Sequence, residues 1–252
     1  MTALDHLIAK LRPLPLSDPA VATPAWEGSV VADPELWNRV ETAPRARFPE
    51  LRAPWKHGWR SQDAELDRLH AAAKRIAPTT VIETGTLAAH ATCALAVAME
   101  EATGAGRLFT IDYDGDPVQD GKGTISAKDW AELRANREAN LAAVRAAAPS
   151  VEVAFREGDS RKVLPSVLEA AGSWDFWFQD SMHYKSGIRE ELDLMLPAMG
   201  EDAYIVFDNV DRVHPFGRWF VRSFLPGAEG RWAYRSLTVG RTRQLWAHRR
   251  LA

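Results

Sequence analysis

The chain has 252 residues, of which 46% are hydrophobic and 26% charged, and its formal net charge at pH 7 is −3. This composition is typical of a globular protein, and the length suits one α/β domain with an extension. The small negative charge gives no electrostatic reason to expect nucleic acid or anionic lipid as a partner. No apolar run approaches the ~20 residues of a membrane-spanning helix, the start lacks the pattern of a secretory signal, and Cys93 is a single cysteine. We therefore expect a cytoplasmic protein without a membrane partner.

Residues 1–60 differ from the rest of the chain. They contain eight of the 15 prolines and four of the 10 tryptophans. Proline interrupts helices and central strands, so this segment predicts short helices and loops. We expect an extension that folds over the main domain, residues 61–252, or over the partner subunit of a homodimer. Its tryptophans would either attach it to that domain or line an aromatic substrate pocket.

From residue 61 onward, apolar patterns of helical and strand periodicity alternate along the chain. Strands are expected at five segments: 79–84, 107–114, 151–160, 174–179 and 203–210. Helices are expected at five others: 61–78, 89–102, 126–148, 160–171 and 185–199. This alternation predicts a parallel sheet covered by helices on both faces.

The last segment, residues 231–250, has a different pattern. It alternates between apolar and polar residues, is interrupted near Gly240 and then alternates again. This pattern predicts a hairpin. The expected fold class is therefore α/β, with a doubly wound, mostly parallel sheet and a C-terminal antiparallel hairpin.

Every expected parallel strand ends in polar residues. In open α/β sheets, ligands bind at the carboxyl ends of the strands. A site at this edge is therefore expected from the residues that follow the five strands: Glu83 and Gly85, Asp112 and Asp114, Gly158 to Ser160, Asp180 and His183, and Asp208 and Asn209.

The turn after the first strand suits a nucleoside better than a dinucleotide. Glu83, Thr84 and Gly85 open this turn, and the glycine would let the backbone approach a ligand. Asp112 ends the second strand, where a carboxylate can hold both hydroxyls of a ribose. The dinucleotide fingerprint of three glycines is absent, because Leu87 and Ala89 occupy places where glycines would help a pyrophosphate.

The ends of the fourth and fifth strands carry hard oxygen ligands. Asp180, Asp208 and Asn209 suit Mg²⁺ or Mn²⁺ if these two strands are neighbours in the sheet. His183 follows three residues after Asp180 and has an unperturbed pKa suited to taking a proton near neutrality. Lys185 is the competing base.

These residues together resemble a known family. From about residue 60, the chain resembles class I S-adenosylmethionine (SAM)-dependent methyltransferases, and within them the metal-dependent small-molecule O-methyltransferases of the catechol and bacterial macrolide-sugar types. The resemblance implies a Rossmann-like fold and SAM and Mg²⁺ as cofactors. It places Glu83–Gly85 at the methionine end of SAM, Asp112 at the ribose and Asp159–Ser160 beside the adenine. Asp180, Asp208 and Asn209 match the metal ligands, and Asp180 also counts among the residues near the cofactor.

The acceptor implied by the resemblance is a phenolic or sugar hydroxyl of a small molecule, for example a natural product. The catechol type has lysine where His183 stands, whereas the sugar-modifying type has a histidine base. Two other functions stay open: an NAD(P)-dependent oxidoreductase on the same kind of sheet, and a non-catalytic nucleoside-binding module. The oxidoreductase is disfavoured by the single glycine and by the acidic ligand set, which hydride transfer does not need.

Overall fold

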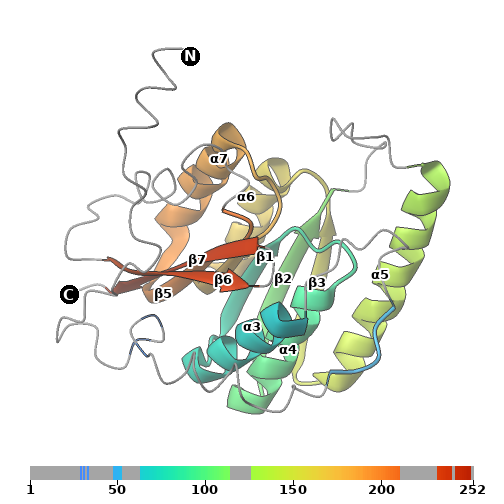
Figure 1. Cartoon of the computed structure of the whole chain (residues 1–252), viewed down its shortest axis with the longest axis horizontal. Helices are drawn as coiled ribbons and strands as arrows, with labels where there is room; N and C mark the ends of the chain where they lie inside the picture. The colour runs from blue at the N-terminus through green and yellow to red at the C-terminus, as the bar shows by residue number, and fades with distance from the viewer. Residues whose placement is uncertain are drawn as a thin grey trace.

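The computed structural model describes residues 29, 31, 33, 48–52, 63–113, 126–210, 232–239 and 242–250. Within them, the chain forms one sheet with helices on both faces (Figure 1). No helix in these ranges is long and apolar enough to cross a membrane. Most of the predicted N-terminal extension, with its four tryptophans, lies outside the described residues, as does the turn at Gly240.

The sheet has seven strands in the order β3-β2-β1-β4-β5-β7-β6. The first five strands are parallel to one another, and β7 is antiparallel to both β5 and β6. The predicted mostly parallel sheet with a C-terminal hairpin is therefore confirmed. The strand bounds are β1 Thr80–Thr84, β2 Gly106–Asp112, β3 Val151–Glu157, β4 Trp174–Gln179, β5 Met199–Phe207, β6 Trp232–Val239 and β7 Thr242–Arg250.

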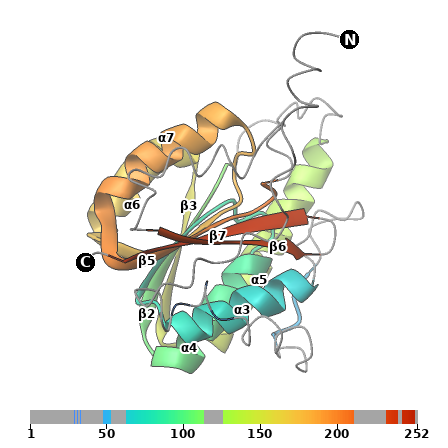
Figure 2. The ribbon, with the colours of Figure 1, turned by 60° about the vertical axis from the view of Figure 1, so that its left-hand side comes forward.

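The helices form two layers around the sheet (Figure 2). One layer contains α3, α4 and α5, and the other contains α6 and α7. All five predicted helices are present: α3 Asp63–Ile76, α4 His90–Thr103, α5 Ala127–Ala147, α6 Ser160–Ala171 and α7 Lys185–Met195, the last followed by a 3₁₀ turn at Leu196–Ala198.

Strand β4 is apolar on both faces because it is central. It lies between β1 and β5. Phe176 and Phe178 belong to the core under α3, α4 and α5, while Trp174 and Trp177 belong to the core under α6 and α7. All four side chains are at most 1% exposed. A strand buried on both sides loses the alternation of polar residues, which explains the run of aromatic residues in the sequence.

The few described residues of the N-terminal segment contact the main domain. Val31 is fully buried in the core. The Ser29 hydroxyl is 2.6 Å from Nδ1 of His248 on β7, and the Arg52 backbone bonds with Asn140 of α5. These contacts show that the described N-terminal residues touch both β7 of the sheet and helix α5. The division of the chain at residue 60 and the homodimer stay predictions.

Candidate active site

The predicted site residues come together at one edge of the sheet. The connections change direction between β1 and β4, and the carboxyl ends of the strands on either side of this switch point are where ligands bind in such sheets. Glu83 and Thr84 end β1, and Asp112 ends β2. Asp159 and Ser160 follow β3, Asp180 follows β4, and Asp208 and Asn209 follow β5.

Two carboxylates and an amide meet at the ends of β4 and β5. The Asn209 Nδ2 donates to Asp180 Oδ1 at 3.2 Å and to Asp208 Oδ2. His183 Nε2 lies 3.6 Å from the same Asp180 oxygen. Asn209 has a φ of 50°, a left-handed conformation that asparagine tolerates better than most residues. The predicted proximity of these four residues is therefore present in the structure.

The carboxyl groups of this cluster disfavour one another's ionisation. Burial raises the pKa of Asp180 well above its ordinary value, and the nearby carboxylates of Asp208 and Glu65 raise it further. Asp208 Oδ1 and Asn209 Oδ1 are buried and receive no hydrogen bond from the described residues. No group of three or more His, Cys, Asp or Glu side chains in the described ranges is arranged to hold a metal ion. The cluster is thus two acids and an amide with two unsatisfied oxygens.

The two candidate bases lie in different settings. His183 is in the loop between β4 and α7, and its side chain is 27% exposed. Lys185 is the first residue of α7 and is exposed. Between them, Tyr184 is half exposed, and its hydroxyl donates to the Met182 sulfur at 2.8 Å. Of the two bases, His183 is the one placed against Asp180.

Glu83 is fully buried beneath the turn after β1. Its Oε2 accepts from the Thr92 hydroxyl at 2.5 Å, while Oε1 lacks a hydrogen bond of normal geometry from the described residues. Burial raises the pKa of Glu83 to about 7, although the bond from Thr92 lowers it. The neighbouring Thr84 hydroxyl accepts from Trp177 Nε1 at 3.3 Å.

The structure gives a reason for Gly85 in addition to the expected approach of a ligand. Its φ is 100°, and a Cβ placed there would lie 2.4 Å from the Asp180 carbonyl oxygen. The missing side chain therefore makes room for the chain's own backbone at Asp180. Gly85 N also donates to Ile111 O at 2.8 Å, and Asp180 N donates to Thr84 O at 2.8 Å. Gly85 is thus bonded to β2, and Thr84 before it is bonded to the end of β4.

Asp112 is held by groups on three elements. Its Oδ2 accepts from Leu87 N at 2.8 Å and from Arg137 Nη1 at 3.2 Å, and its Oδ1 accepts from Tyr113 N at 2.9 Å. Burial raises the pKa of Asp112 to about 6, against the opposing charge of Arg137. The Arg137 side chain is almost fully buried, and its guanidinium stacks on the Phe155 ring at 4.5 Å. Sequence reasoning missed Arg137.

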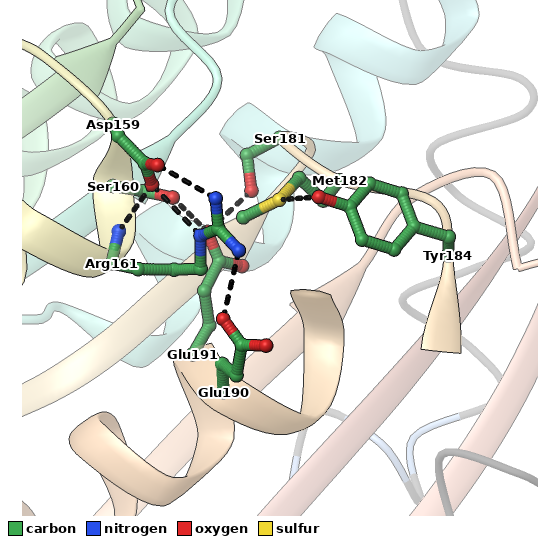
Figure 3. Close-up of polar contacts among 8 residues, drawn as sticks. All are labelled: Asp159, Ser160, Arg161, Ser181, Met182, Tyr184, Glu190 and Glu191. Carbon is green, nitrogen blue, oxygen red and sulfur yellow. Dashed lines mark hydrogen bonds and ion pairs between the residues drawn. The ribbon is translucent and has the colours of Figure 1, made fainter. Parts of the chain in front are cut away.

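Asp159 and Ser160 begin α6 and are both bonded within the chain (Figure 3). Asp159 caps the helix by accepting from Arg161 N, and it pairs with the Arg161 side chain, which also reaches Glu190. The hydrogen bonds from Arg161 lower the pKa of Asp159. Ser160 donates instead to Glu191 of α7.

Glu191 connects the loops after β3 and β4. It is fully buried, and burial raises its pKa. Besides Ser160, it accepts from Ser181 Oγ at 2.6 Å (Figure 3) and from Gln179 Nε2 at 3.1 Å. The sequence did carry a signal for it: an acid within the apolar face that Ile188 and Leu192 form on α7.

The strand order and the site at the switch point define the fold of class I methyltransferases, as the resemblance predicted. Residues 82–210 match the family described as "Methyltransferase domain", and this match spans half of the chain. The chain therefore belongs to the methyltransferase domain family. It has no significant match among curated proteins.

Solved structures similar to the chain share this fold. A Klebsiella pneumoniae protein described as a proposed O-methyltransferase is 21% identical, with a TM-score of 0.57 and coverage of 99% of this chain and 97% of that one. The O-methyltransferase TomG from Streptomyces achromogenes, involved in tomaymycin synthesis and solved with SAM, is 20% identical (TM-score 0.55; 90% and 95% covered). An O-methyltransferase from Bacillus cereus, solved with SAH, is 19% identical (TM-score 0.52; 90% and 96% covered).

Proposed function

We propose that the protein is a metal-assisted O-methyltransferase that moves a methyl group from SAM to a hydroxyl of a small molecule, such as a phenol or a sugar of a natural product. One observation carries this proposal: a methyltransferase sheet in which two acids, an amide and a histidine meet at the ends of β4 and β5. Similar structures that contain SAM or SAH support the choice of methyl donor.

The residues at the ends of β4 and β5 fit a divalent cation. Asp180 and Asp208 are neighbouring acids whose mutual repulsion disfavours a second negative charge. Asp208 Oδ1 and Asn209 Oδ1 are buried oxygens without a hydrogen bond from the described residues. Oxygen donors of this kind suit Mg²⁺ or Mn²⁺, with solvent or acceptor completing the coordination. The Asn209 amide now presents its nitrogen to the acids, so it would have to turn over to act as a ligand.

The residues on the β1 side would hold SAM. Glu83 has a buried oxygen available for the ammonium of the methionine part, beside Thr84 and Gly85. Asp112 is the candidate for the ribose, and the loop that contains Asp159 and Ser160 is the candidate for the adenine. SAM supplies an electrophilic sulfonium methyl group, and a bound cation would favour the ionised acceptor hydroxyl.

His183 would remove the proton from the acceptor hydroxyl. Its ring lies beside Asp180, so a hydroxyl held at the acid cluster would be within its reach. An unperturbed histidine is largely unprotonated near neutral pH, whereas an unperturbed lysine is not. Lys185 remains the alternative base. Holding the acceptor oxygen in line with the methyl group would supply much of the rate acceleration.

The test combines binding with methyl transfer. Calorimetry should show that SAM and SAH bind and that NAD⁺ does not. Methyl transfer to a panel of phenols, catechols and sugars should fall in EDTA and return with Mg²⁺ or Mn²⁺. Binding of NAD⁺ without SAM would reject the methyltransferase assignment. Full activity in EDTA, after elemental analysis has excluded retained metal, would reject the requirement for a metal but not the methyltransferase assignment.

A further inference from the structure

The turn between β1 and α4 has a strained backbone. Leu87 has a φ of 47° and Ala89 a φ of 64°, which place both in the left-handed region. A residue with a Cβ is disfavoured there and stays only where its surroundings hold it. Neither position is occupied by glycine, the residue that adopts this conformation most readily. Some part of the structure must therefore hold this turn in place.

One face of α5 lies against the turn. Trp130 and Leu133 pack in a small buried cluster with Leu87 and Ala88. Arg137 and Asn140 come one and two turns further along the same helix. The spacing of three, four and three residues puts all four side chains on one side of α5.

Asn140 contributes three hydrogen bonds from a side chain that is 2% exposed. Its Nδ2 donates to Ala88 O at 2.7 Å, between the two strained residues. The same nitrogen donates to Arg52 O at 2.8 Å, and Oδ1 accepts from Arg52 N at 2.7 Å. A single amide thus ties the turn to α5 and to the N-terminal segment.

Arg137 acts on the turn through Asp112. It bonds Asp112 Oδ2, and the same oxygen accepts from Leu87 N. The turn is therefore held at Leu87 N through the carboxylate and at Ala88 O through Asn140. The contact at Ala88 O comes directly from α5, and the contact at Leu87 N comes from Asp112 of β2, which Arg137 of α5 holds.

We propose that Asn140 is a positioning residue for SAM binding. It keeps the turn after β1 in the left-handed conformation that glycines would adopt unaided, and Arg137 supports it through Asp112. This inference rests on the proposed function, because it assumes that this turn meets the methionine part of SAM. It extends that function by giving α5 and the N-terminal segment at Arg52 a part in cofactor affinity.

A double-mutant cycle tests the proposal. Asn140→Ala should weaken SAM binding about tenfold in calorimetry, because the turn loses a buried hydrogen bond and relaxes from its bound conformation. Ala89→Gly alone should change SAM affinity by less than about twofold. In the Asn140→Ala background, it should restore most of the lost affinity, because glycine has no Cβ to disfavour the left-handed conformation. Arg145→Ala, which removes a bond from α5 to Val153 O of β3, is the matched control and should leave SAM affinity unchanged.

Other outcomes separate the two proposals. Wild-type affinity in Asn140→Ala, or a loss that Ala89→Gly does not restore, overturns the role of Asn140 while SAM binding by the wild type stands. Absence of SAM binding by the wild type overturns both proposals. If Asn140→Ala does not fold, Asn140→Leu keeps the volume of the side chain and takes its place in the cycle. Amide hydrogen exchange at residues 86–89 in the ligand-free protein should accelerate in either Asn140 variant, and unchanged exchange would also overturn the proposal.

Discussion

Asp112, on the β1 and β2 side of the site, differs from the Asp180 and Asp208 pair, on the β4 and β5 side, in how its carboxylate is satisfied. On the β1 and β2 side, Asp112 accepts hydrogen bonds from Leu87 N, Tyr113 N and Arg137. On the β4 and β5 side, Asp180 and Asp208 face each other across a single amide, with buried oxygens left over. The Asp112 carboxylate is satisfied by the chain itself, whereas the Asp180 and Asp208 pair has an acceptor oxygen, Asp208 Oδ1, without a hydrogen bond from the described residues. We therefore expect the first group to determine affinity for the methyl donor and the second to determine the rate of transfer.

The largest expected effect is a loss of methyl-transfer rate when the acid pair at the ends of β4 and β5 is changed. Asp208→Ala should lower methyl transfer about 10³–10⁴-fold, because a catalytic metal contributes several kcal/mol. SAM affinity should stay within about twofold, since Asp208 itself is not among the residues proposed to contact SAM. Single-turnover assays and calorimetry measure the two quantities. Asp193→Ala, which removes an exposed carboxylate of α7, is the control. A parallel loss of SAM affinity would mean that the two halves are not separate.

His183→Ala should come next, with a loss of about 10²–10³-fold in the rate of methyl transfer, within the range for removal of a positioned base. SAM affinity should again be retained. Lys185→Ala provides the comparison and should cost much less. Rates of methyl transfer measured across the neutral pH range for both variants decide which of the two residues is the base. If Lys185→Ala loses the activity and His183→Ala keeps it, the base is Lys185.

Changes at Asp112, on the β1 and β2 side, should alter the affinity for SAM. Asp112→Ala should weaken SAM binding by ~1.5–3 kcal/mol, or about 10–150-fold, the scale of charge-assisted hydrogen bonds. It should also lower the melting temperature, because Arg137 would be left buried without its carboxylate. Asp112→Asn keeps an oxygen for Leu87 N and tests whether the charge matters. Unchanged SAM affinity in folded Asp112→Ala would remove Asp112 from the cofactor site.

The smallest effect is a pH dependence of SAM binding. The pKa of Glu83 is raised to about 7, so the group is mostly protonated below that pH and cannot pair with an ammonium. SAM affinity should therefore rise about eightfold between about pH 6 and about pH 7.5. Binding should also be accompanied by proton release. Glu83→Gln should bind more weakly and lose this dependence, and the same slope in Glu83→Gln would assign it to another group.

Sequence patterns predicted the sheet, its hairpin and the edge at which the site lies. Asp180 and Asp208 could be placed together because each ends a strand and the two strands were expected to be neighbours. Arg137 and Asn140 could not be predicted, because a polar residue on a helix does not show which distant backbone it will bond. The left-handed backbone conformation of Ala89 could not be predicted from the sequence either, since alanine rarely adopts it. Glu191 was detectable in principle, as an acid within an apolar face.

The close approach of Gly85 to Asp180 also limits how the protein can evolve. A Cβ added at residue 85 would lie only 2.4 Å from the Asp180 carbonyl oxygen, so there is no room for a side chain between the turn after β1 and the end of β4. Any insertion or larger residue at position 85 would disturb the turn after β1 and the end of β4 at once. We therefore expect new acceptor specificities to arise from side-chain replacements, in loops such as 181–184, and not from shifts of the two strand ends.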